Sequence, residues 1–254
     1  MTKLRILICI DDTDNREAGG TGDLALKYKC AIADYGWGST SPITRHQLYV
    51  HADIPYTSHN SAMCFGADIA DDCLEKVIDF GQAFLTAEAE DGSDPGLCVV
   101  VSDRLASPEE LVDFGRRAKR TVLTKEEAYG TAARLGVHLS EHGGTGGGVI
   151  GALAGAGLHL SGSDGRVKGK YYFSADRRVV TVREICDRTN VEEVRTENRE
   201  SLGEDETVRL GKKIKSVYLD GKIALLVEPA EDGTSAAQDG AKWVTLAKEK
   251  LKNY

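Results

Sequence analysis

The stretch LICIDDTDNREAGGTG, residues 7–22, joins an apolar run to a group of carboxylates and then to a glycine turn that opens a helix. A short apolar run that ends abruptly in acidic residues is typical of a central β-strand. Asp11, Asp12 and Asp14 lie within four positions of one another. Carboxylates this close repel one another, so we expect something to compensate for their charge.

A magnesium site is the compensation that we predict. At the end of a strand the chain can bend so that Asp12 and Asp14 converge. Mg²⁺ takes oxygen ligands and bridges carboxylates to substrate phosphates. We therefore expect Asp11, Asp12 and Asp14 to be both the metal ligands and the catalytic residues. The alternative is a solvated turn whose aspartates cap the next helix.

Two glycine-rich turns are candidates for phosphate binding, because a glycine turn at a helix start leaves backbone N–H groups open to an anion. The first is Gly20, Thr21 and Gly22, at the start of a predicted helix over residues 21–36. The second follows His142 and precedes a helix of small residues. Its predicted nucleotide-binding residues are Gly144, Thr145, Gly146, Gly147 and Gly148. The alternative for this second turn is a hinge that lets the helix pack closely.

Three other ligand-binding motifs fit the region of the second turn less well. Gly146, Gly148 and Gly151 formally match the dinucleotide fingerprint, which also needs a preceding strand in a βαβ unit and a later acidic residue. No Lys-Ser/Thr pair completes a Walker P-loop. The segment from His138 to His142 matches the inverted zinc-peptidase motif H-x-x-E-H, but that motif needs a continuing helix. A zinc hydrolase centred on His138 and His142 therefore stays an alternative hypothesis for this region.

A polar segment, Ser58, His59 and Asn60, is predicted to form the substrate wall of the ligand site. It precedes a stretch that we expect to be one long helix, up to residue 90. The alternative role for Asn60, or for Ser61 after it, is to cap that helix.

Composition limits the class of protein. The 254 residues suit one large domain or two small ones, and the net charge of −8 argues against a broad basic surface for nucleic acid. None of the six cysteines forms a C-x-x-C pair, so we expect buried free thiols in a reducing cytoplasm. No apolar stretch reaches the length of a membrane span, and the first ten residues lack a secretory signal pattern.

The order of patterns predicts an α/β (α+β) fold with a body over residues 1–167 and a β-rich segment over 168–254. In the body, strands over 4–10, 44–54 and 97–102 alternate with helices, two of which begin at capping boxes at Ser107 and Thr124. In the second part we expect strands in KGKYYFSA and RRVVTVREI, an acidic surface excursion over 187–206, a hairpin turning at Asp220-Gly221, and a helix over 240–252.

Three of these motifs together resemble the front half of the archaeal isoleucine-tRNA agmatinylcytidine synthetase. They are IDDTD at Ile10–Asp14, the segment Asp53–Ala62, and the glycine segment Gly147–Ala154. The resemblance covers about residues 4–175. It implies a kinase-like domain with a ferredoxin-like part, ATP and Mg²⁺ at the three aspartates, and phosphoryl transfer.

The chain also departs from this family. The family carries an oligonucleotide-binding domain and a cysteine zinc ribbon that hold the tRNA, and this chain has no C-x-x-C pair. We therefore predict an ATP- and Mg²⁺-dependent phosphotransferase with a small acceptor, with nucleotide and small molecule as its partners. The alternatives are a nucleotide- or anion-binding module without turnover, and a tRNA-modifying enzyme like the family.

Overall fold

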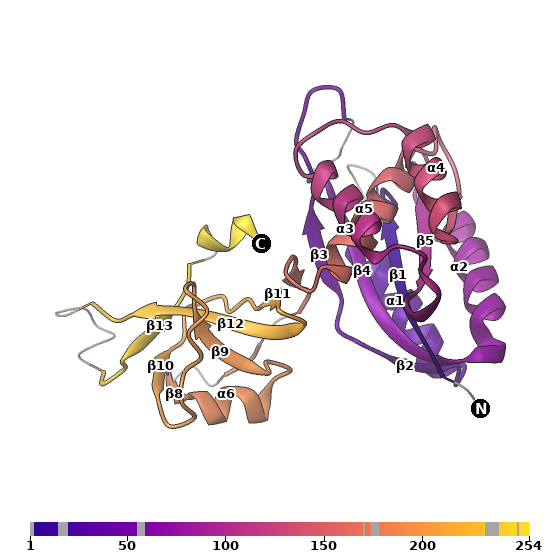
Figure 1. Ribbon diagram of the computed structural model, residues 1–254. Coiled ribbons are helices and arrows are strands. Elements are labelled where there is room, and N and C mark those ends of the chain that lie inside the picture. Colours follow the sequence, from indigo (N-terminus) through magenta and orange to yellow (C-terminus); the bar gives the residue numbers. More distant parts are fainter. Residues whose placement is uncertain are drawn as a thin grey trace. The chain divides into compact units, whose positions relative to one another are not determined.

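The structure is a computed structural model that describes residues 3–14, 20–54, 59–169, 171–173, 178–231, 239–247 and 249–254. The chain divides into two compact units, Met1–Ser161 and Gly162–Tyr254. Figure 1 colours the chain along its sequence, so the first unit runs from indigo to rose and the second from orange to yellow.

The first unit is built on an antiparallel sheet with β1 near its centre (Figure 1). The strand order is β6-β5-β1-β4, and both β2 and β3 pair with the far edge of β4. The strands are β1 (Lys3–Asp11), β2 (Gly38–Thr40), β3 (Thr44–Gln47), β4 (Ser61–Ala70), β5 (Gly96–Val101) and β6 (His138–Glu141).

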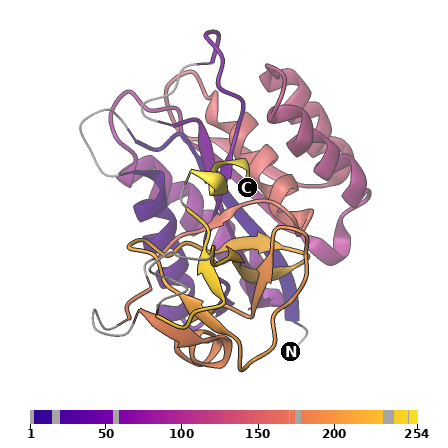
Figure 2. The ribbon, with the colours of Figure 1, turned by 90° about the vertical axis from the view of Figure 1, so that its left-hand side faces the viewer.

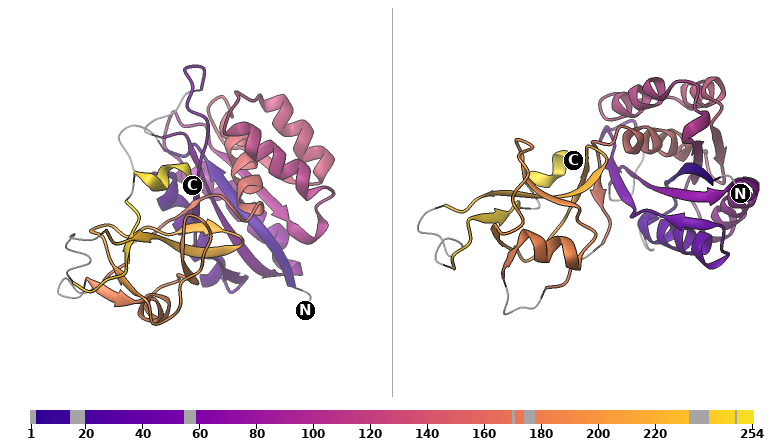
Figure 3. Two further views of the ribbon diagram at one scale, coloured as in Figure 1. Left: turned by 60° about the vertical axis from the view of Figure 1, so that its left-hand side comes forward. Right: turned by 60° about the horizontal axis from the view of Figure 1, so that its bottom comes forward.

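Helices cover both faces of this sheet (Figure 3). One face packs against α1 (Thr21–Asp34) and α2 (Leu74–Glu88), and the other against α3 (Pro108–Ala118), α4 (Lys125–Leu135) and α5 (Gly148–Leu160). Strand β1 supplies both cores by alternation. Its residues Ile6, Ile8 and Ile10 enter the first core, and Leu7 and Cys9 enter the second. The central strand predicted from the apolar run is confirmed.

Close packing of α5 on the sheet places the strand end of β1 against this helix. A Cβ added at Gly155 would lie only 2.5 Å from Cys9 Sγ, and one added at Gly151 would overlap the Asp11 carboxyl group. The glycines of α5 thus bring its backbone close to the carboxylates. The close helix packing considered for this segment is observed, and its role as a hinge stays a prediction.

The second unit, seen from a different side in Figure 2, is β-rich. Its strand order is β7-β11-β12-β13-β10-β8, with β9 also pairing with β12. The elements are β7 (Arg166–Val167), β8 (Val179–Thr181), α6 (Val182–Arg188), β9 (Glu193–Thr196), β10 (Thr207–Arg209), β11 (Val217–Leu219), β12 (Lys222–Pro229) and β13 (Trp243–Thr245). The hairpin predicted at Asp220-Gly221 is confirmed, and so is the mixed α and β fold class.

The largest departure from the sequence-based prediction lies after residue 58. The predicted long helix is instead strand β4, a short 3₁₀ turn (Asp71–Cys73) and then α2. Strand β4 pairs on both sides and packs against helices on both faces, so its sequence shows no alternation of apolar and polar residues. A fully buried strand cannot be told from a buried helix by periodicity alone. The capping role considered for Asn60 and Ser61 is therefore wrong.

Smaller differences from the sequence-based prediction lie in the second unit. Residues 182–188 form α6 rather than a strand, because Thr181 and Glu184 make a capping box. The predicted helix at 240–252 is replaced by β13 and a 3₁₀ turn (Lys250–Asn253), and the predicted excursion at 187–206 contains β9.

Further along the chain, Tyr171–Phe173 is not strand. Of the two predicted capping boxes, the one at Thr124 is present and Ser107 makes no side-chain cap. Cys30 is exposed rather than buried.

No helix in the described part of the chain has the length and apolar character needed to cross a membrane.

Candidate functional site

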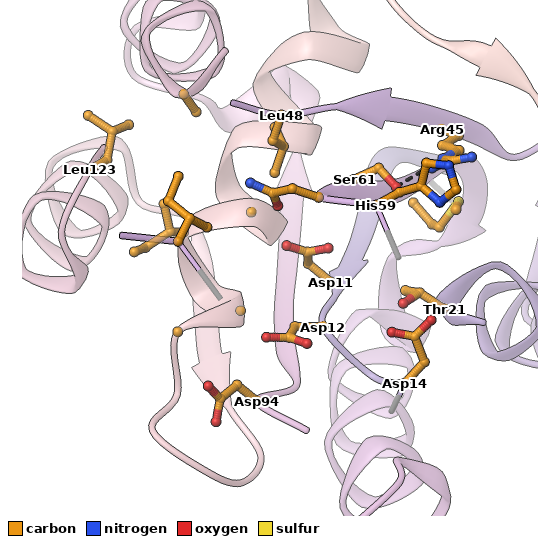
Figure 4. Close-up of a pocket in the computed structure, with 18 of the residues that line it drawn as sticks. Asp11, Asp12, Asp14, Thr21, Arg45, Leu48, His59, Ser61, Asp94 and Leu123 are labelled. Atoms are coloured by element: carbon orange, nitrogen blue, oxygen red, sulfur yellow. Dashed lines mark hydrogen bonds between the residues drawn. The ribbon is translucent and has the colours of Figure 1, made fainter. Parts of the chain in front are cut away.

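A cavity of about 340 Å³ opens in the first unit where β1 ends (Figure 4). Its polar lining consists of Asp11, Asp12, Asp14, Gly20, Thr21, Gly22, Arg45, Asp53, His59, Asn60, Ser61, Asp94, Thr121, Thr145, Gly147, Gly148 and Gly151. Its apolar lining consists of Leu48, Ile54, Met63, Ala118, Val122, Leu123 and Ile150. Five carboxylates thus share one small cavity with an apolar wall.

Asp11 and Asp12 occupy the middle of this cavity, and Figure 4 shows both carboxyl groups pointing into it. Asp11 is the last residue of β1 and is 8% exposed. Asp12 takes a left-handed backbone conformation with φ of 52°, which is uncommon outside glycine. This bend is the physical reason that consecutive aspartates face the same cavity, whereas a straight strand would send them to opposite faces.

The electrostatics of the two aspartates agree with the predicted repulsion. Burial raises the pKa of Asp11 to about 8, with further contributions from the charges of Asp12 and Asp14. Burial also raises the pKa of Asp12 to about 6, and the nearby carboxylates of Asp94 and Asp14 add to this. In the described part of the chain, no cation lowers the pKa of either carboxyl group.

The donor set suits magnesium without enclosing it. Among the described residues, no three histidine, cysteine or carboxylate groups are close enough to hold one ion together. Mg²⁺ keeps several waters and commonly takes only one or two carboxylates together with substrate phosphates. Asp12, with Asp11 or Asp14, offers hard oxygen ligands of this kind, so the residues present fit a magnesium ion that is shared with a phosphate ligand.

The start of α1 lies next to this carboxylate group. Gly20 is the N-cap residue, and among the residues that the structure describes no side chain caps the helix. A Cβ added at Gly20 would lie 3.5 Å from Asp14 Oδ2, and Thr21 and Gly22 also line the cavity. The uncapped N–H groups of a 14-residue helix therefore begin beside Asp14, in the place where an anion gains from the helix dipole.

The second glycine turn contacts the same cavity only in part. Thr145, Gly147 and Gly148 line it, but Gly144 and Gly146 do not. Gly144 and Gly146 instead have positive φ angles of 56° and 74°, which the turn requires.

Asp94 holds this turn. Its carboxylate accepts a bond of 2.5 Å from Thr145 N and one of 2.6 Å from the Thr145 hydroxyl. The Gly148 N–H donates to the Asp94 carbonyl oxygen over 3.0 Å. A Cβ at Gly148 would overlap that carbonyl, whereas Gly147 has room for one. The turn therefore already binds an acidic side chain of its own chain.

The predicted substrate residues border the polar end of the cavity. His59 and Asn60 line it, and Ser58 lies outside the described residues. The Asn60 side chain donates to the Tyr49 carbonyl over 2.6 Å, which holds the segment before β4 in place. Figure 4 shows His59 beside Arg45 and Ser61, where Arg45 Nε donates to Ser61 Oγ over 2.9 Å.

Sequence reasoning missed Arg45, Asp94 and the apolar wall. Asp94 sits in the turn-rich segment EDGSDPG, which gives no local sign of function. Arg45 lies on β3 and reaches the cavity only because β3 pairs with β4. The wall of Leu48, Val122 and Leu123 joins residues that are far apart in the sequence, so no local pattern could identify it.

The zinc-peptidase hypothesis fails on local structure. His138 and Glu141 are the ends of strand β6, not part of a helix. His138 Nε2 and His142 Nε2 lie 3.0 Å and 2.8 Å from the Ser140 hydroxyl, and Glu141 pairs with Lys125 at 2.5 Å. The helix on which that motif depends is absent from this stretch.

Neither a protein-family model nor a curated protein matches the chain. Solved structures do share its fold. The complex of TiaS with an isoleucine tRNA and ATP is 24% identical with a TM-score of 0.52, covering 61% of this chain and 36% of that one. A tRNA fluorescent labeling enzyme is 23% identical with a TM-score of 0.55, covering 71% of this chain and 42% of its own.

The complex of TiaS with the same tRNA, AMPCPP and agmatine is 20% identical with a TM-score of 0.51, covering 72% of this chain and 44% of that one. TiaS is an agmatidine synthetase for this isoleucine tRNA. This chain thus spans less than half of each of those chains, and the resemblance in fold inferred from the three motifs is confirmed.

Proposed function

We propose that this chain is an ATP- and Mg²⁺-dependent phosphotransferase that acts on a small acceptor in the cavity at the end of β1. The observation that carries the proposal is the convergence of Asp11, Asp12 and Asp14 with the uncapped start of α1. A cation and a phosphate together would satisfy both features. Two structures of similar fold are complexes of TiaS with ATP or AMPCPP, which supports a nucleotide here.

The roles of the residues follow from their positions. Asp12 and Asp14 would hold the metal, since Asp14 borders the helix start and Asp12 faces the middle of the cavity. The N–H groups at Thr21 and Gly22 would bind phosphate oxygens. Asp11 lies beside Leu48 and Gly151, where it would orient a polar group of the nucleotide or acceptor. A bound Mg²⁺ would neutralise phosphate charge and align the transferred group.

The acidic lining favours a small acceptor over a polyanion. Asp53 and Asp94 add two further carboxylates to the three at the strand end, and among the described residues Arg45 is the cationic side chain in the lining. Such a cavity repels additional phosphates that no metal accompanies. Its wall of Leu48, Val122 and Leu123 would instead contact an apolar part of a ligand, either the base or the acceptor.

Magnesium-dependent binding and turnover test the proposal. Calorimetric titration with ATP is expected to give binding with Mg²⁺ and little without it, and phosphate release from ATP should be lost in Asp12→Asn. Asp103→Asn is a matched control, because Asp103 is exposed and pairs with Arg5 on the surface. Binding without turnover, across a panel of small amines and alcohols, would favour a nucleotide-binding module. Absence of magnesium-dependent binding would refute the proposal.

A second candidate function is ATP-dependent modification of tRNA. It is supported by the similar structures, in which TiaS is complexed with an isoleucine tRNA and another enzyme labels tRNA. This candidate predicts tight, specific tRNA binding, whereas the small-acceptor proposal predicts none.

A further inference from the structure

Arg195, on strand β9 of the second unit, is a buried cation with unused hydrogen-bond donors. It is 4% exposed. Its Nη1 donates to Asp220 Oδ2 over 2.8 Å and lies 3.0 Å from Glu193 Oε1. Its Nε and Nη2 are buried and have no acceptor among the residues that the structure describes. One edge of the guanidinium is therefore satisfied and the adjacent edge is not.

Further charged side chains pair with the two carboxylates that neighbour Arg195. Arg199 Nη1 donates to Asp220 Oδ1 over 3.0 Å, and Lys222 Nζ lies 3.5 Å from Glu193 Oε2. We call Glu193, Arg195, Arg199, Asp220 and Lys222 the arginine cluster. Its three cations and two carboxylates sum to a charge of +1. Neither carboxylate satisfies the unused edge of Arg195. Asp220 is shared with Arg199, and Glu193 Oε1, which is itself buried without a hydrogen-bond partner among the described residues, lies near Nη1 instead.

Backbone conformation marks the same place. Among the described residues, Asp12, Arg199 and Asp220 are the non-glycine residues with positive φ, and two of these three belong to the arginine cluster. The φ of Arg199 is 68° and that of Asp220 is 52°. The positive φ of Asp220 belongs to the two-residue hairpin turn Asp220-Gly221, which places its carboxylate beside Arg195 and Arg199. The third, Asp12, faces the cavity of the first unit.

The chemistry of the guanidinium defines what is missing. Arginine does not lose its proton in proteins, so burial cannot be relieved by neutralisation. A buried donor without an acceptor carries its full desolvation penalty. The Nε and Nη2 donors point in parallel and match the two oxygens of a carboxylate or a phosphate. We propose that the arginine cluster is a binding site for a small oxyanion, held by two hydrogen bonds from Arg195.

The C-terminal turn lies on the same side of this sheet. Leu226 is the register partner of Arg195, and it packs in one apolar cluster with Leu251 of the 3₁₀ turn Lys250–Asn253. Lys250 and Glu228 form an ion pair beside it. The C-terminal turn therefore packs beside Arg195 on the same face of the sheet, and binding at this defined position should be saturable.

Thermal unfolding of the full chain in sodium phosphate tests the site, with sodium acetate as the carboxylate arm and sodium chloride at equal ionic strength as the reference. Magnesium-free buffer leaves the cavity of the first unit acidic and unfavourable for phosphate. The unfolding temperature should rise saturably with at least one of the two oxyanions. In Arg195→Lys, which keeps the charge but loses the paired donors, the apparent Kd should rise at least tenfold.

Arg209→Lys is the matched control, since Arg209 also pairs with a carboxylate, Asp239, in the same unit. Its apparent Kd should stay within twofold of wild type. Should Arg195→Lys fail to fold, amide chemical shifts of the wild type replace it, and oxyanion titration should move residues 193–196 and Asp220 first. No saturable shift beyond chloride, an equal response in Arg195→Lys, or shifts confined to other residues would overturn the proposal.

Discussion

Asp12 in the cavity and Asp220 in the arginine cluster share a residue type and a backbone angle, since both have a φ of 52°. Their electrostatics are opposite. Burial raises the pKa of Asp12 to about 6, with nearby carboxylates adding to it, whereas the hydrogen bond from Arg195 lowers the pKa of Asp220. An aspartate with this backbone angle thus lies among other carboxylates in the first unit and between two arginines in the second.

The largest effect should come from removing the charge of Asp12. Asp12→Asn keeps the shape and tolerates positive φ, because asparagine adopts this conformation readily. We expect magnesium-dependent ATP affinity to fall by more than about 100-fold, since a bound metal supplies several kcal/mol of charge stabilisation. Calorimetry with and without Mg²⁺ measures this. Wild-type affinity in the variant would mean that Asp12 holds no metal.

Unfolding in metal-free buffer extends the comparison to stability. At pH 8, Asp12→Asn should stabilise the protein by about 1–2 kcal/mol, because a raised carboxyl pKa reports a charged form that is unfavourable in the folded state. Asp220→Asn should destabilise it, because Arg195 and Arg199 lose their shared carboxylate. Guanidinium unfolding midpoints of both variants provide the test. Changes of the same sign would remove the contrast between the two aspartates.

The pH dependence of stability should reveal Asp11. Its folded pKa of about 8 lies above its ordinary value of 3.8, so the folded state binds an extra proton between these values. The contribution of Asp11 to the free energy of unfolding is therefore fully present at low pH. It is lost as the pH rises toward 8, by up to about 1.4 kcal/mol per pH unit.

Histidines with lowered pKa act in the opposite direction, so the informative quantity is the difference in unfolding free energy between wild type and Asp11→Asn at pH 5, 6.5 and 8. This difference should favour the variant increasingly as pH rises, and Mg²⁺ with ATP should reduce it. A difference that does not vary with pH would contradict the burial of an uncompensated Asp11.

Two glycines separate packing from ligand binding. Gly151→Ala should cost about 1–3 kcal/mol, because its Cβ would displace the Asp11 carboxyl group. Gly147→Ala should change stability by less than about 0.5 kcal/mol, since its Cβ would have contacts of 3.6 Å and its φ is −60°. Unfolding midpoints with ATP titrations distinguish the two. Equal destabilisation would assign the whole turn to packing.

The sequence predicted the parts of the site that are local. The end of an apolar run at Asp11 and the glycine start at Gly20 are readable without tertiary structure, and both line the cavity. Strand β4 was not readable, because burial on both faces removes its alternation. Asp94 and Arg45 reach the cavity through strand pairing and loop packing, which no local pattern encodes.

The arginine cluster was equally hidden from the sequence. Its members are 29 positions apart at most, yet they lie in a segment interpreted as acidic surface and in a hairpin turn. Only the pairing of β9 with β12 brings Arg195 to a buried position beside Leu226. The charge of this segment therefore predicted that it would be exposed, whereas the pairing register of β9 with β12 buries Arg195.

The smallest expected effect is on tRNA binding, which asks whether either the acidic cavity or the arginine cluster serves a nucleic acid. The cavity is acidic and Arg195 is buried, and the exposed cations of the arginine cluster, Arg199 and Lys222, already pair with carboxylates. Two further basic groups are Arg116, Arg117, Lys119 and Arg120 around the end of α3, and Lys212, Lys213 and Lys215 before the hairpin. Arg117 already pairs with Glu127 at 2.5 Å. Aromatic side chains for base stacking are not interleaved with either group.

We therefore expect binding of total tRNA no tighter than the non-specific range, roughly 10⁻⁴–10⁻⁶ M at physiological salt. Filter-binding titrations at two salt concentrations measure both the affinity and its salt dependence. Each phosphate contact contributes about −0.7 to −0.9 to the slope of log affinity against log salt concentration. Arg116→Gln should then reduce the slope by about one contact. Nanomolar retention that persists at physiological salt would instead establish a specific RNA surface, favour the tRNA-modifying candidate, and show that the acidic cavity does not determine the acceptor.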